Sequence, residues 1–268
     1  MTTPTDTSVL LLRLAGPLQS WGENSKFNRR ETRTEPTKSG VIGLLAAALG
    51  LERGADLNAL TELDIGVRTD QPGTLLRDFH TVSDYRGQPL KQSGVNAKGS
   101  QKPTTPAKYT HVTQRYYLQD AVFLVGLAGI SETIKELAAA MKRPVFPPAL
   151  GRRSCVPTQP ILAGTPDTEL MVALSSHPWQ ASEAARRDYL RGTEPAFVHL
   201  PVTIDDPAGD GTRQDVPVSF GLHDRQYQQR RVRHTTVQIP TGFPEPDAEN
   251  AGSGTPPVGH DPFSLLNW

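Results

Sequence analysis

Two segments of the chain each place a strand pattern before a helix pattern. Residues 8–14, SVLLLRL, form an apolar run typical of a buried strand, and residues 38–49, KSGVIGLLAAAL, follow with a broad apolar helix face. Residues 113–129 give the strongest strand pattern of the chain, and residues 131–143, SETIKELAAAMKR, follow with a one-faced amphipathic helix that Ser131 is expected to cap. Short strand patterns lie between the two pairs. This order predicts an α+β fold of the split βαβ, ferredoxin-like type, which is also the RRM scaffold.

The segments outside these two pairs carry weaker signals. Residues 64–70 and 74–83 are strand-like runs joined by a Gln-Pro-Gly turn. Beyond residue 165 the periodicity fades, and the main patterns are strands at 196–204 and 216–220 and a helix at 182–190. These patterns indicate a second, β-rich part of the chain.

The start of the first expected helix resembles the end of a phosphate-binding P-loop. Residues 36–40 read PTKSG and open an apolar helix, as the Lys-Ser pair of a Walker A loop does. A Walker A loop needs glycines where this chain has Thr32 and Thr37, and no strand pattern precedes Thr32, so we reject a nucleotide-hydrolysing site. With Thr37 as N-cap and Gly50 after the last turn, two interpretations remain. The free N–H groups bind another anion, or the segment is a core helix with a basic cap.

Positive and negative charges are unevenly distributed along the chain. The totals cancel, with 28 Lys plus Arg and 28 Asp plus Glu, so the net charge indicates no partner. Residues 85–115 carry cations and no acid in a stretch rich in Gly, Ser, Thr and Pro, whereas residues 243–268 carry acids and no Lys or Arg. A loop of that length is usually functional or disordered, and we expect the acidic tail to be disordered.

Several classes of protein are disfavoured by what the chain lacks. The first eight residues are polar, so we expect no signal peptide, and no apolar run approaches the roughly 18 residues of a membrane span. The one cysteine, Cys155, excludes an internal disulfide and a cysteine-built zinc site. A buried structural role for Cys155 is favoured over a reactive thiol beside Arg152 and Arg153. We expect a soluble, cytoplasmic protein.

Catalytic and metal-binding patterns are weak. The seven histidines are scattered without a ligand spacing, so we expect no metal and no cofactor. Lys108, Tyr109 and His111 are the one group that we consider for general acid–base cleavage of RNA, and His111 is favoured as a solvated loop residue. Because an unperturbed Lys or Tyr has a pKa of about 10, either would need strong tuning to act as a base at neutral pH.

Cationic clusters with aromatic neighbours favour nucleic-acid binding. The basic segment holds Tyr85 and Tyr109 among its cations, which suits phosphate neutralisation together with base stacking. The motif GRRSC places two arginines directly after Gly151, where a backbone can approach a phosphate closely. The motif RQYQQRRVRH supplies a third cluster, Arg225, Arg230, Arg231 and Arg233. Together the three clusters predict RNA or DNA binding.

Five sequence blocks resemble one known family. They read LLLRLAGPLQSWG, PTKSGVIGLLAAALG, LRDFHTVSDYRG, YLQDAVFLVGL and PALGRRSC, and they lie in this order within residues 8–158. In this order they are similar to the CasD subunits of type I-E CRISPR Cascade, which are RAMP-superfamily proteins of the Cas5 group. GPLQSWG and PTKSG together are highly specific, whereas the chain beyond residue 165 matches only loosely.

The resemblance implies a ferredoxin-like RAMP domain with a long inserted β-hairpin, the thumb, near residues 85–115, and a small C-terminal β element. It implies a RAMP domain at 1–160, a β-rich region at 161–240 and an acidic tail at 241–268. The family's role implies a non-catalytic subunit that holds the 5′ handle of CRISPR RNA and caps one end of the complex. Its neighbours would be the backbone subunit and the large PAM-reading subunit. Because related type I-C subunits cut repeat RNA, a metal-independent endoribonuclease is the alternative.

The resemblance and the cationic clusters together give a set of expected RNA contacts. The start of the first helix is expected to meet backbone phosphate. Trp21 either stacks on a base or fills the core, and the core is favoured because tryptophan is usually largely buried. The full set is Gln19, Ser20, Trp21, Lys38, Ser39, Arg77, Tyr85, Arg86, Lys91, Lys98, Lys102, Lys108, Tyr109, His111, Arg115, Arg152 and Arg153.

Overall fold

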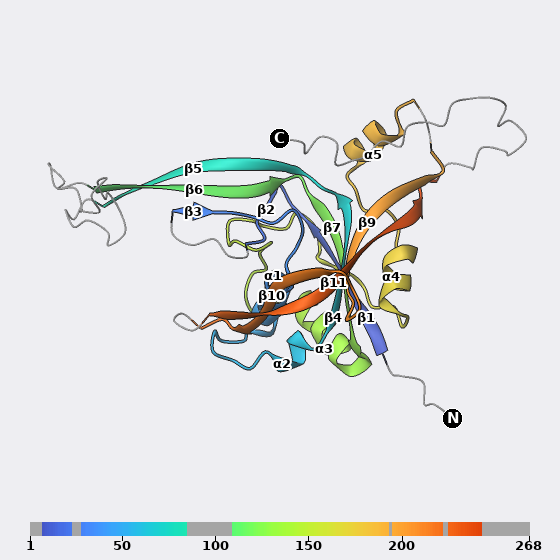
Figure 1. The fold of residues 1–268 in the computed structure, drawn as a ribbon, viewed down its shortest axis with the longest axis horizontal. Helices are drawn as coiled ribbons and strands as arrows, with labels where there is room; N and C mark the ends of the chain where they lie inside the picture. Colours follow the sequence, from blue (N-terminus) through green and yellow to red (C-terminus); the bar gives the residue numbers. More distant parts are fainter. Residues whose placement is uncertain (1–6, 23–27, 85–108, 193–194, 222–224, 243–268) are drawn as a thin grey trace, which may run out of the picture.

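The computed structural model describes residues 7–22, 28–84, 109–192, 195–221 and 225–242 (Figure 1). Its strands are β1 Thr7–Ala15, β2 Leu18–Gln19, β3 Arg29–Arg30, β4 Asp64–Gln71, β5 Thr74–Asp84, β6 Tyr109–Gln119, β7 Val122–Ile130, β8 Leu162–Gly164, β9 Phe197–Asp205, β10 Gly211–Ser219 and β11 Gln226–Pro240. Its helices are α1 Lys38–Leu49, α2 Asn58–Thr61, α3 Ser131–Lys142, α4 Leu170–Ser176 and α5 Glu183–Leu190. The strands form two sheets. The larger has the order β10-β11-β9-β4-β7-β1-β8, and the smaller has the order β2-β6-β3 with β5 paired to β6.

The chain order of the central elements agrees with the α+β expectation. Strands β8, β1, β7 and β4 are neighbours in one sheet and pair antiparallel. Helix α1 lies in sequence between β1 and β4, and α3 lies between β7 and β8. These elements follow the order β-α-β-β-α-β along the chain, in an antiparallel part of the sheet.

The larger sheet has a separate apolar core on each face. In β1, Leu10, Leu12 and Leu14 join the cluster that contains the buried residues of α1 and α3. Val9 and Leu11 alternate with them and join the second cluster, beneath α4. A strand that is buried on both faces needs apolar residues at consecutive positions, which explains why the 8–14 segment shows no polar alternation.

Helix α1 begins and ends as its sequence predicts. The Thr37 hydroxyl accepts a hydrogen bond from the Gly40 N–H at 3.2 Å, so Thr37 is the N-cap. Gly50 follows the last turn with a φ of 76°, in the left-handed region that favours glycine. Both predicted caps are confirmed.

The expectation of one continuous strand over residues 113–129 is wrong. The segment forms β6 and β7, which belong to different sheets and are separated at Asp120, where φ is +56°. Gly73 has a φ of +74° and packs so closely on Gln119 and Ala121 that a Cβ would collide with them. The predicted Gln-Pro-Gly turn therefore supports this break, although both strands carry an uninterrupted β pattern.

Ser131 does not cap helix α3 as predicted. Ile130 is the N-cap residue, and no side chain caps the helix there. Ser131 is the first helical residue, and its Oγ lies 2.5 Å from the Oγ of Ser8 on β1. The Ser131 hydroxyl therefore bonds to a neighbouring strand and leaves the helix start uncapped.

The C-terminal region extends the larger sheet beyond β4. The strands predicted at 196–204 and 216–220 appear as β9 and β10, and the helix predicted at 182–190 appears as α5, capped by Ser182. Helix α4 was not predicted, nor was the long strand β11, whose sequence QYQQRRVRHTTVQIP is polar. Because β9 pairs with β4, the strands of the predicted 161–240 region share one sheet with those of 1–160.

Strands β5 and β6 form a hairpin that projects away from the larger sheet (Figure 1). The thumb expected near 85–115 has strands at Thr74–Asp84 and Tyr109–Gln119, so it begins earlier and ends later than predicted. Residues 85–108 lie outside the described part of the chain. Among the described helices, none is long and apolar enough to cross a membrane.

Candidate nucleic-acid interface

Five separate segments meet around a cavity of about 250 Å³, which we call the arginine cavity. They are the turn after β1, strand β3, the start of α1, the GRRSC loop and the end of the β10–β11 hairpin. Two of the predicted sequence blocks, GPLQSWG and PTKSG, therefore meet in space. The lining residues are Ser20, Trp21, Gly22, Arg30, Glu31, Thr37, Ser39, Gly40, Gly151, Arg152, Phe220, Arg225 and Tyr227.

The GRRSC loop is held against the turn that follows β1. Gly151 has a φ of +87°, and a Cβ at this position would collide with the carbonyl group of Ser20. The Ser20 N–H donates to the Leu150 carbonyl at 3.1 Å, and the Cys155 N–H donates to the Arg152 carbonyl at 2.8 Å. Only glycine allows both this backbone conformation and this close approach, which places Arg152 at the cavity wall.

The Arg152 side chain ties the loop to the base of the hairpin. Its guanidinium donates to the carbonyls of Tyr116 at 3.2 Å and Arg30 at 2.8 Å. The same group lies 4.8 Å from the centroid of the Tyr117 ring, a cation–π contact. Arg152 remains half-buried at the cavity, so it can position the hairpin and still present positive charge there. Its neighbour Arg153 is exposed.

The start of helix α1 already holds an anion from the protein itself. The Lys38 N–H donates to Asp215 Oδ2 at 2.8 Å, so a carboxylate from β10 occupies the positive end of the helix. The Lys38 ammonium pairs with Asp205 Oδ2 at 3.1 Å, and this side chain is only 6% exposed. Both the N–H and the ammonium of Lys38 are occupied by carboxylates of the protein itself, so we no longer expect the predicted phosphate contact of Lys38.

Arg230 completes this buried ionic network. It donates to Asp215 Oδ1 at 2.7 Å and to Asp205 Oδ1 at 2.5 Å. Burial acts to lower the pKa of Arg230, but its hydrogen bonds and ion pairs with the two aspartates outweigh burial and raise the pKa. We call Lys38, Asp205, Asp215 and Arg230 the ionic network. It fastens the C-terminal hairpin to helix α1.

The turn that follows β1 is built around buried Trp21, which confirms the favoured core position. The Trp21 ring is fully buried, and its Nε1 donates to Gln19 Oε1 at 3.0 Å. Gln19 is also fully buried, and its amide nitrogen donates to the carbonyls of Leu14 and Ala121. The polar atoms of Gln19 are used inside the protein, so we no longer expect its predicted base contact. Ser20 and Ser39 lie in the cavity lining.

The glycine of PTKSG has a packing role. A Cβ at Gly40 would lie 2.7 Å from Cε3 of the Trp21 ring. The indole therefore packs directly on the helix backbone, and no larger residue fits between them. This contact explains why Lys-Ser-Gly opens the helix in a protein that lacks the other P-loop glycines.

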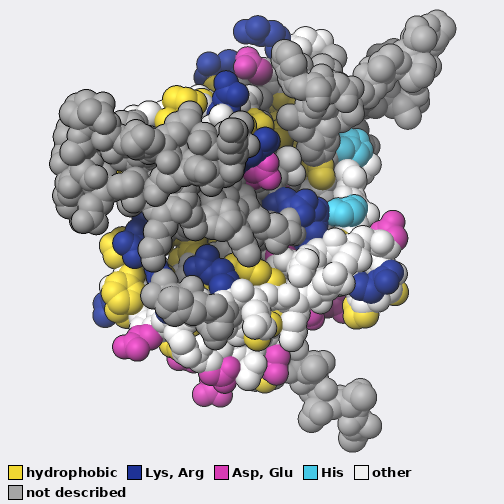
Figure 2. Space-filling view, turned by 60° about the vertical axis from the view of Figure 1, so that its left-hand side comes forward, with side chains coloured by type: hydrophobic (Ala, Val, Ile, Leu, Met, Phe, Trp, Pro, Cys, Tyr) yellow, Lys and Arg dark blue, Asp and Glu magenta, His cyan; other side chains and the backbone are white. Residues whose placement is uncertain are grey.

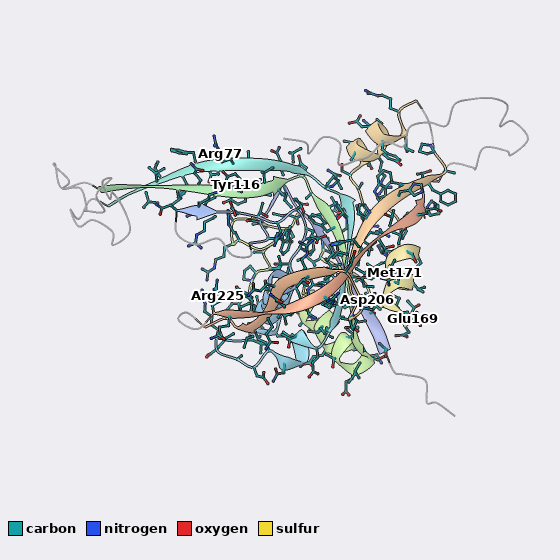
Figure 3. The ribbon with its side chains drawn as sticks, viewed as in Figure 1. Arg77, Tyr116, Glu169, Met171, Asp206 and Arg225 are labelled. Atoms are coloured by element: carbon teal, nitrogen blue, oxygen red, sulfur yellow. The ribbon has the colours of Figure 1, made fainter. Side chains whose placement is uncertain are left out.

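The hairpin carries further exposed cations. Arg77 of β5 lies opposite Tyr116 of β6 in the strand register (Figure 3). The guanidinium of Arg29 lies 5.3 Å from the Tyr116 ring centroid, and Arg115 is half-buried opposite Asp78. On the face shown in Figure 2, Lys and Arg lie over the central and upper parts, and Asp and Glu gather along the lower edge.

The remaining predicted contacts lie at or beyond the limit of the described side chains. Tyr109 and His111 belong to strand β6, and their side chains are outside the description. The others fall in the undescribed segment 85–108, and they are Tyr85, Arg86, Lys91, Lys98, Lys102 and Lys108.

Four residues of the cavity lining, Arg30, Glu31, Phe220 and Tyr227, were not predicted from the sequence. A signal for Arg30 was present in the adjacent arginines Arg29 and Arg30, but no motif marked them. The RQYQQRRVRH cluster was named as one unit, yet only Arg225 of its arginines lines the cavity.

The other arginines of that cluster serve the fold. Arg231 donates to the Gly209 carbonyl at 2.8 Å, and Arg233 pairs with Asp206 at 2.9 Å. Arg230 belongs to the ionic network. Positive charge in this part of the sequence is therefore mostly used within the protein.

Cys155 is fully buried, as predicted for a structural cysteine. Burial raises the pKa of its thiol, so little thiolate forms at neutral pH. In the described part of the chain, no group of three or more His, Cys, Asp or Glu side chains is placed to hold a metal ion.

Comparisons with known proteins give the family of this chain. The family model described as CRISPR-associated protein (Cas_Cas5) matches residues 9–233. The CRISPR system Cascade subunit CasD of Escherichia coli (strain K12) is 40% identical over 176 residues, which cover 59% of this chain and 71% of that protein.

Two solved structures are also similar to this chain. One, titled CRISPR RNA-guided surveillance complex, matches at a TM-score of 0.65 with 34% identity, covering 87% of this chain and 91% of the other. The second, titled Crystal structure of Cas protein, matches at a TM-score of 0.63 with 34% identity, covering 88% and 100%. The chain therefore belongs to the Cas5 family of CRISPR-associated proteins. Within that family it is of the CasD type of type I-E Cascade, as its sequence blocks indicated.

Proposed function

We propose that this chain is a non-catalytic, RNA-binding subunit of a cytoplasmic Cascade complex in CRISPR antiviral defence. It holds the 5′ handle of the CRISPR RNA and caps one end of the complex. The neighbouring backbone subunit and the large PAM-reading subunit are its expected protein partners. The likeness to a Cascade subunit and to a chain of an RNA-guided surveillance complex supports this assignment.

The observation that carries the proposal is the convergence of Arg30, Arg152 and Arg225 on one cavity. These arginines come from strand β3, the GRRSC loop and the segment that leads into β11, which are far apart in the sequence. Guanidinium groups neutralise phosphates, and this term supplies much of the affinity for a nucleic-acid backbone.

Aromatic rings at the same cavity add a second type of contact. Phe220 and Tyr227 line it from the C-terminal hairpin. A ring beside phosphate-binding cations suits single-stranded RNA, whose unpaired bases stack on aromatic side chains. Ser20 and Ser39 add hydroxyl groups at the cavity wall. The arrangement therefore favours a single-stranded segment over a duplex.

The hairpin extends the proposed RNA path beyond the cavity. Arg77 and Arg115 supply a fully and a partly exposed cation on its two opposite faces, and Arg153 supplies an exposed cation in the GRRSC loop. The segment 85–108, which lies outside the described residues, carries lysines that we propose as further RNA contacts.

The cavity chemistry favours binding over RNA cleavage. General acid–base cleavage needs a base near the 2′-hydroxyl and a donor near the leaving oxygen. The described lining offers arginines and one carboxylate, Glu31, which pairs with Arg29 at 2.8 Å. It contains no His or Lys. The endoribonuclease alternative would therefore depend on residues of the hairpin.

Incubation of the purified chain with labelled repeat RNA separates the two functions. The proposal predicts retention of RNA that carries the 5′ handle, weaker retention of an RNA with a scrambled handle, and no cleavage in the absence of metal. Arg225→Ala should weaken retention, whereas Arg233→Ala should leave it unchanged, because Arg233 pairs with Asp206 and does not line the cavity. Cleavage that is lost in a His111→Ala variant would establish the nuclease instead.

A further inference from the structure

A second cavity, of about 330 Å³, lies at the base of the hairpin, and nothing in the proposed RNA-binding function uses it. We call it the hairpin-base cavity. One part of its lining is apolar and consists of Pro72, Leu75, Leu118 and Pro201. Its size and its mixture of apolar and polar lining resemble those of ligand pockets, which begin at about 300 Å³.

The apolar lining continues onto exposed strand residues. Leu75 is 61% exposed, and Phe79, on the same face of β5, is 64% exposed. Val112 of β6 lies opposite Thr81 on that face and is 41% exposed. Large side chains exposed in a row next to a cavity indicate a surface that another segment covers.

The opposite wall of the cavity is polar and firmly held. Arg213 Nη2 lies 2.6 Å from Glu35 Oε1, and the Thr203 hydroxyl donates to Glu35 Oε2 at 2.8 Å. The same hydroxyl lies 3.0 Å from Nδ1 of His234. Arg33 also lines this wall. The wall therefore combines guanidinium, hydroxyl and imidazole groups with one carboxylate, and it suits an apolar segment that also carries a polar residue.

The sequence of this chain contains such a segment. Residues 261–268 read DPFSLLNW and combine four large apolar residues, Phe263, Leu265, Leu266 and Trp268, with Asp261 and no cation. The residues that precede it, 243–260, are rich in Gly, Pro and acids. Both stretches lie outside the described residues, and the described chain ends at Gly242, two residues after β11.

The reach of this connecting stretch fits the cavity. Strand β11 ends at Pro240, and His234 of the cavity wall lies about 20 Å back along the same strand. For a Gly-rich chain of the length of 243–260, the root-mean-square end-to-end distance is roughly 23 Å. A linker whose length matches the span gives the greatest effective concentration, of millimolar order, so weak contacts are sufficient for docking.

We propose that residues 261–268 dock in the hairpin-base cavity of the same chain. Phe263, Leu265, Leu266 and Trp268 supply the apolar contacts with the hairpin side, and Asp261 lies toward the polar wall. The docked segment covers exposed apolar surface at the root of the hairpin in the free subunit. This docking is independent of RNA binding at the arginine cavity.

Hydrogen exchange tests the proposal without altering the folded part of the chain. The full chain is compared with a variant in which Phe263, Leu265, Leu266 and Trp268 are replaced by Ser, and with a Val258→Ser control. The variant should exchange faster than the other two at the backbone amides of 74–76, 116–119 and 202–204. Equal exchange in all three chains would overturn the proposal.

Fluorescence quenching of Trp268 gives a second test from the cavity side. Trp21 and Trp179 are buried, so subtraction of a Trp268→Phe chain isolates the signal of Trp268. Leu75→Asp should increase quenching of Trp268 by acrylamide several-fold, whereas Leu76→Asp, on the opposite face of the same strand, should not. If Trp268 in the unsubstituted chain is quenched like a free indole, or if its protection depends on protein concentration, same-chain docking is excluded.

Discussion

The arginine cavity and the ionic network lie on adjacent sides of the start of helix α1, yet they use their cations in different ways. In the network, Lys38 and Arg230 share the carboxylates of Asp205 and Asp215, and all four side chains are buried or nearly so. In the cavity, Arg30, Arg152 and Arg225 line an open volume beside a single carboxylate, Glu31.

The difference shows how one helix start serves two purposes. Asp215 satisfies the Lys38 N–H and removes that group from any ligand. The fixed network then holds the C-terminal hairpin in place, so that Phe220, Arg225 and Tyr227 of the same hairpin reach the cavity. The cations of the network thus position the hairpin, and those of the cavity line the volume where we propose that RNA binds.

The largest expected loss of stability comes from a substitution in the ionic network. Asp215→Ala removes the partner of both Arg230 and the Lys38 N–H and leaves buried charge uncompensated. Breaking a buried ion pair in this way costs about 3–5 kcal/mol of the free energy of unfolding, measurable by urea denaturation.

Asp206→Ala is the matched control for that variant. Asp206 pairs with Arg233 on the same hairpin, but the Arg233 side chain is 56% exposed. Removal of such a pair should cost less than about 1 kcal/mol. If the two variants were equally stable, the network would not be the element that fastens the hairpin.

An intermediate loss of stability is expected from a substitution at Gly40, in the start of helix α1, which lies between the cavity and the network. Gly40→Ala places a methyl group 2.7 Å from the Trp21 ring, and overpacking of this kind costs about 1–3 kcal/mol. Gly43→Ala, in the same helix, meets no atom closer than 3.7 Å. It should be neutral or stabilise the protein by up to about 1 kcal/mol, because alanine favours helix more than glycine does.

Thermal unfolding of the Gly40→Ala and Gly43→Ala chains measures both changes in stability. If Gly40→Ala kept the stability of the parent chain and weakened only RNA binding, the glycine would serve the ligand directly. The packing account of the PTKSG motif would then fail.

The smallest expected effect concerns a second buried cation, Arg68, and the pH dependence of stability. Arg68 pairs with Asp70 at 2.7 Å and donates to the carbonyl of His177 at 2.7 Å. Burial, followed by the charge of Arg68, lowers the pKa of His177, although Asp70 opposes this shift.

Because the folded pKa of His177 is lowered below 6.5, the unfolded chain binds more protons just below that pH. Stability should therefore fall as the pH drops below about 6.5, and His177→Gln should reduce this fall. The midpoint of urea unfolding is measured at pH 7.0 and at pH 5.5 for the parent chain and for His177→Gln. If the midpoint fell by the same amount between these pH values in both chains, His177 would not titrate as described.

Local signals in the sequence were sufficient for much of the fold. The Thr37 cap, the Gly50 stop and the apolar runs of β1 and α1 act through neighbouring residues, and all were predicted correctly. The break at Asp120 was missed because it depends on the contact of Gly73 with the segment 119–121. Strand β11 was missed because its polar residues form a strand only through pairing with β9 and β10.

The site was predicted less completely than the fold. The motifs GRRSC and GPLQSWG indicated the correct loops, since their glycines mark close backbone approach. The sequence could not show that Lys38 and Arg230 have buried acidic partners, because Asp205 and Asp215 lie far from Lys38 in the chain. For the same reason it could not show that Arg225 reaches the cavity. A cation's role depends on its tertiary partners.

The central claim is that cations of the arginine cavity bind RNA and those of the ionic network do not. The most direct test measures the affinity for 5′-handle RNA over a range of salt concentrations for the parent chain, Arg225→Ala and Lys38→Met. Arg225→Ala should bind more weakly, with a salt slope that is less steep by roughly 0.7 for each phosphate that the side chain neutralises. Lys38→Met should keep the parent slope, because its ammonium is paired with Asp205 inside the protein. An unchanged slope in Arg225→Ala, or a flattened one in Lys38→Met, would contradict the account.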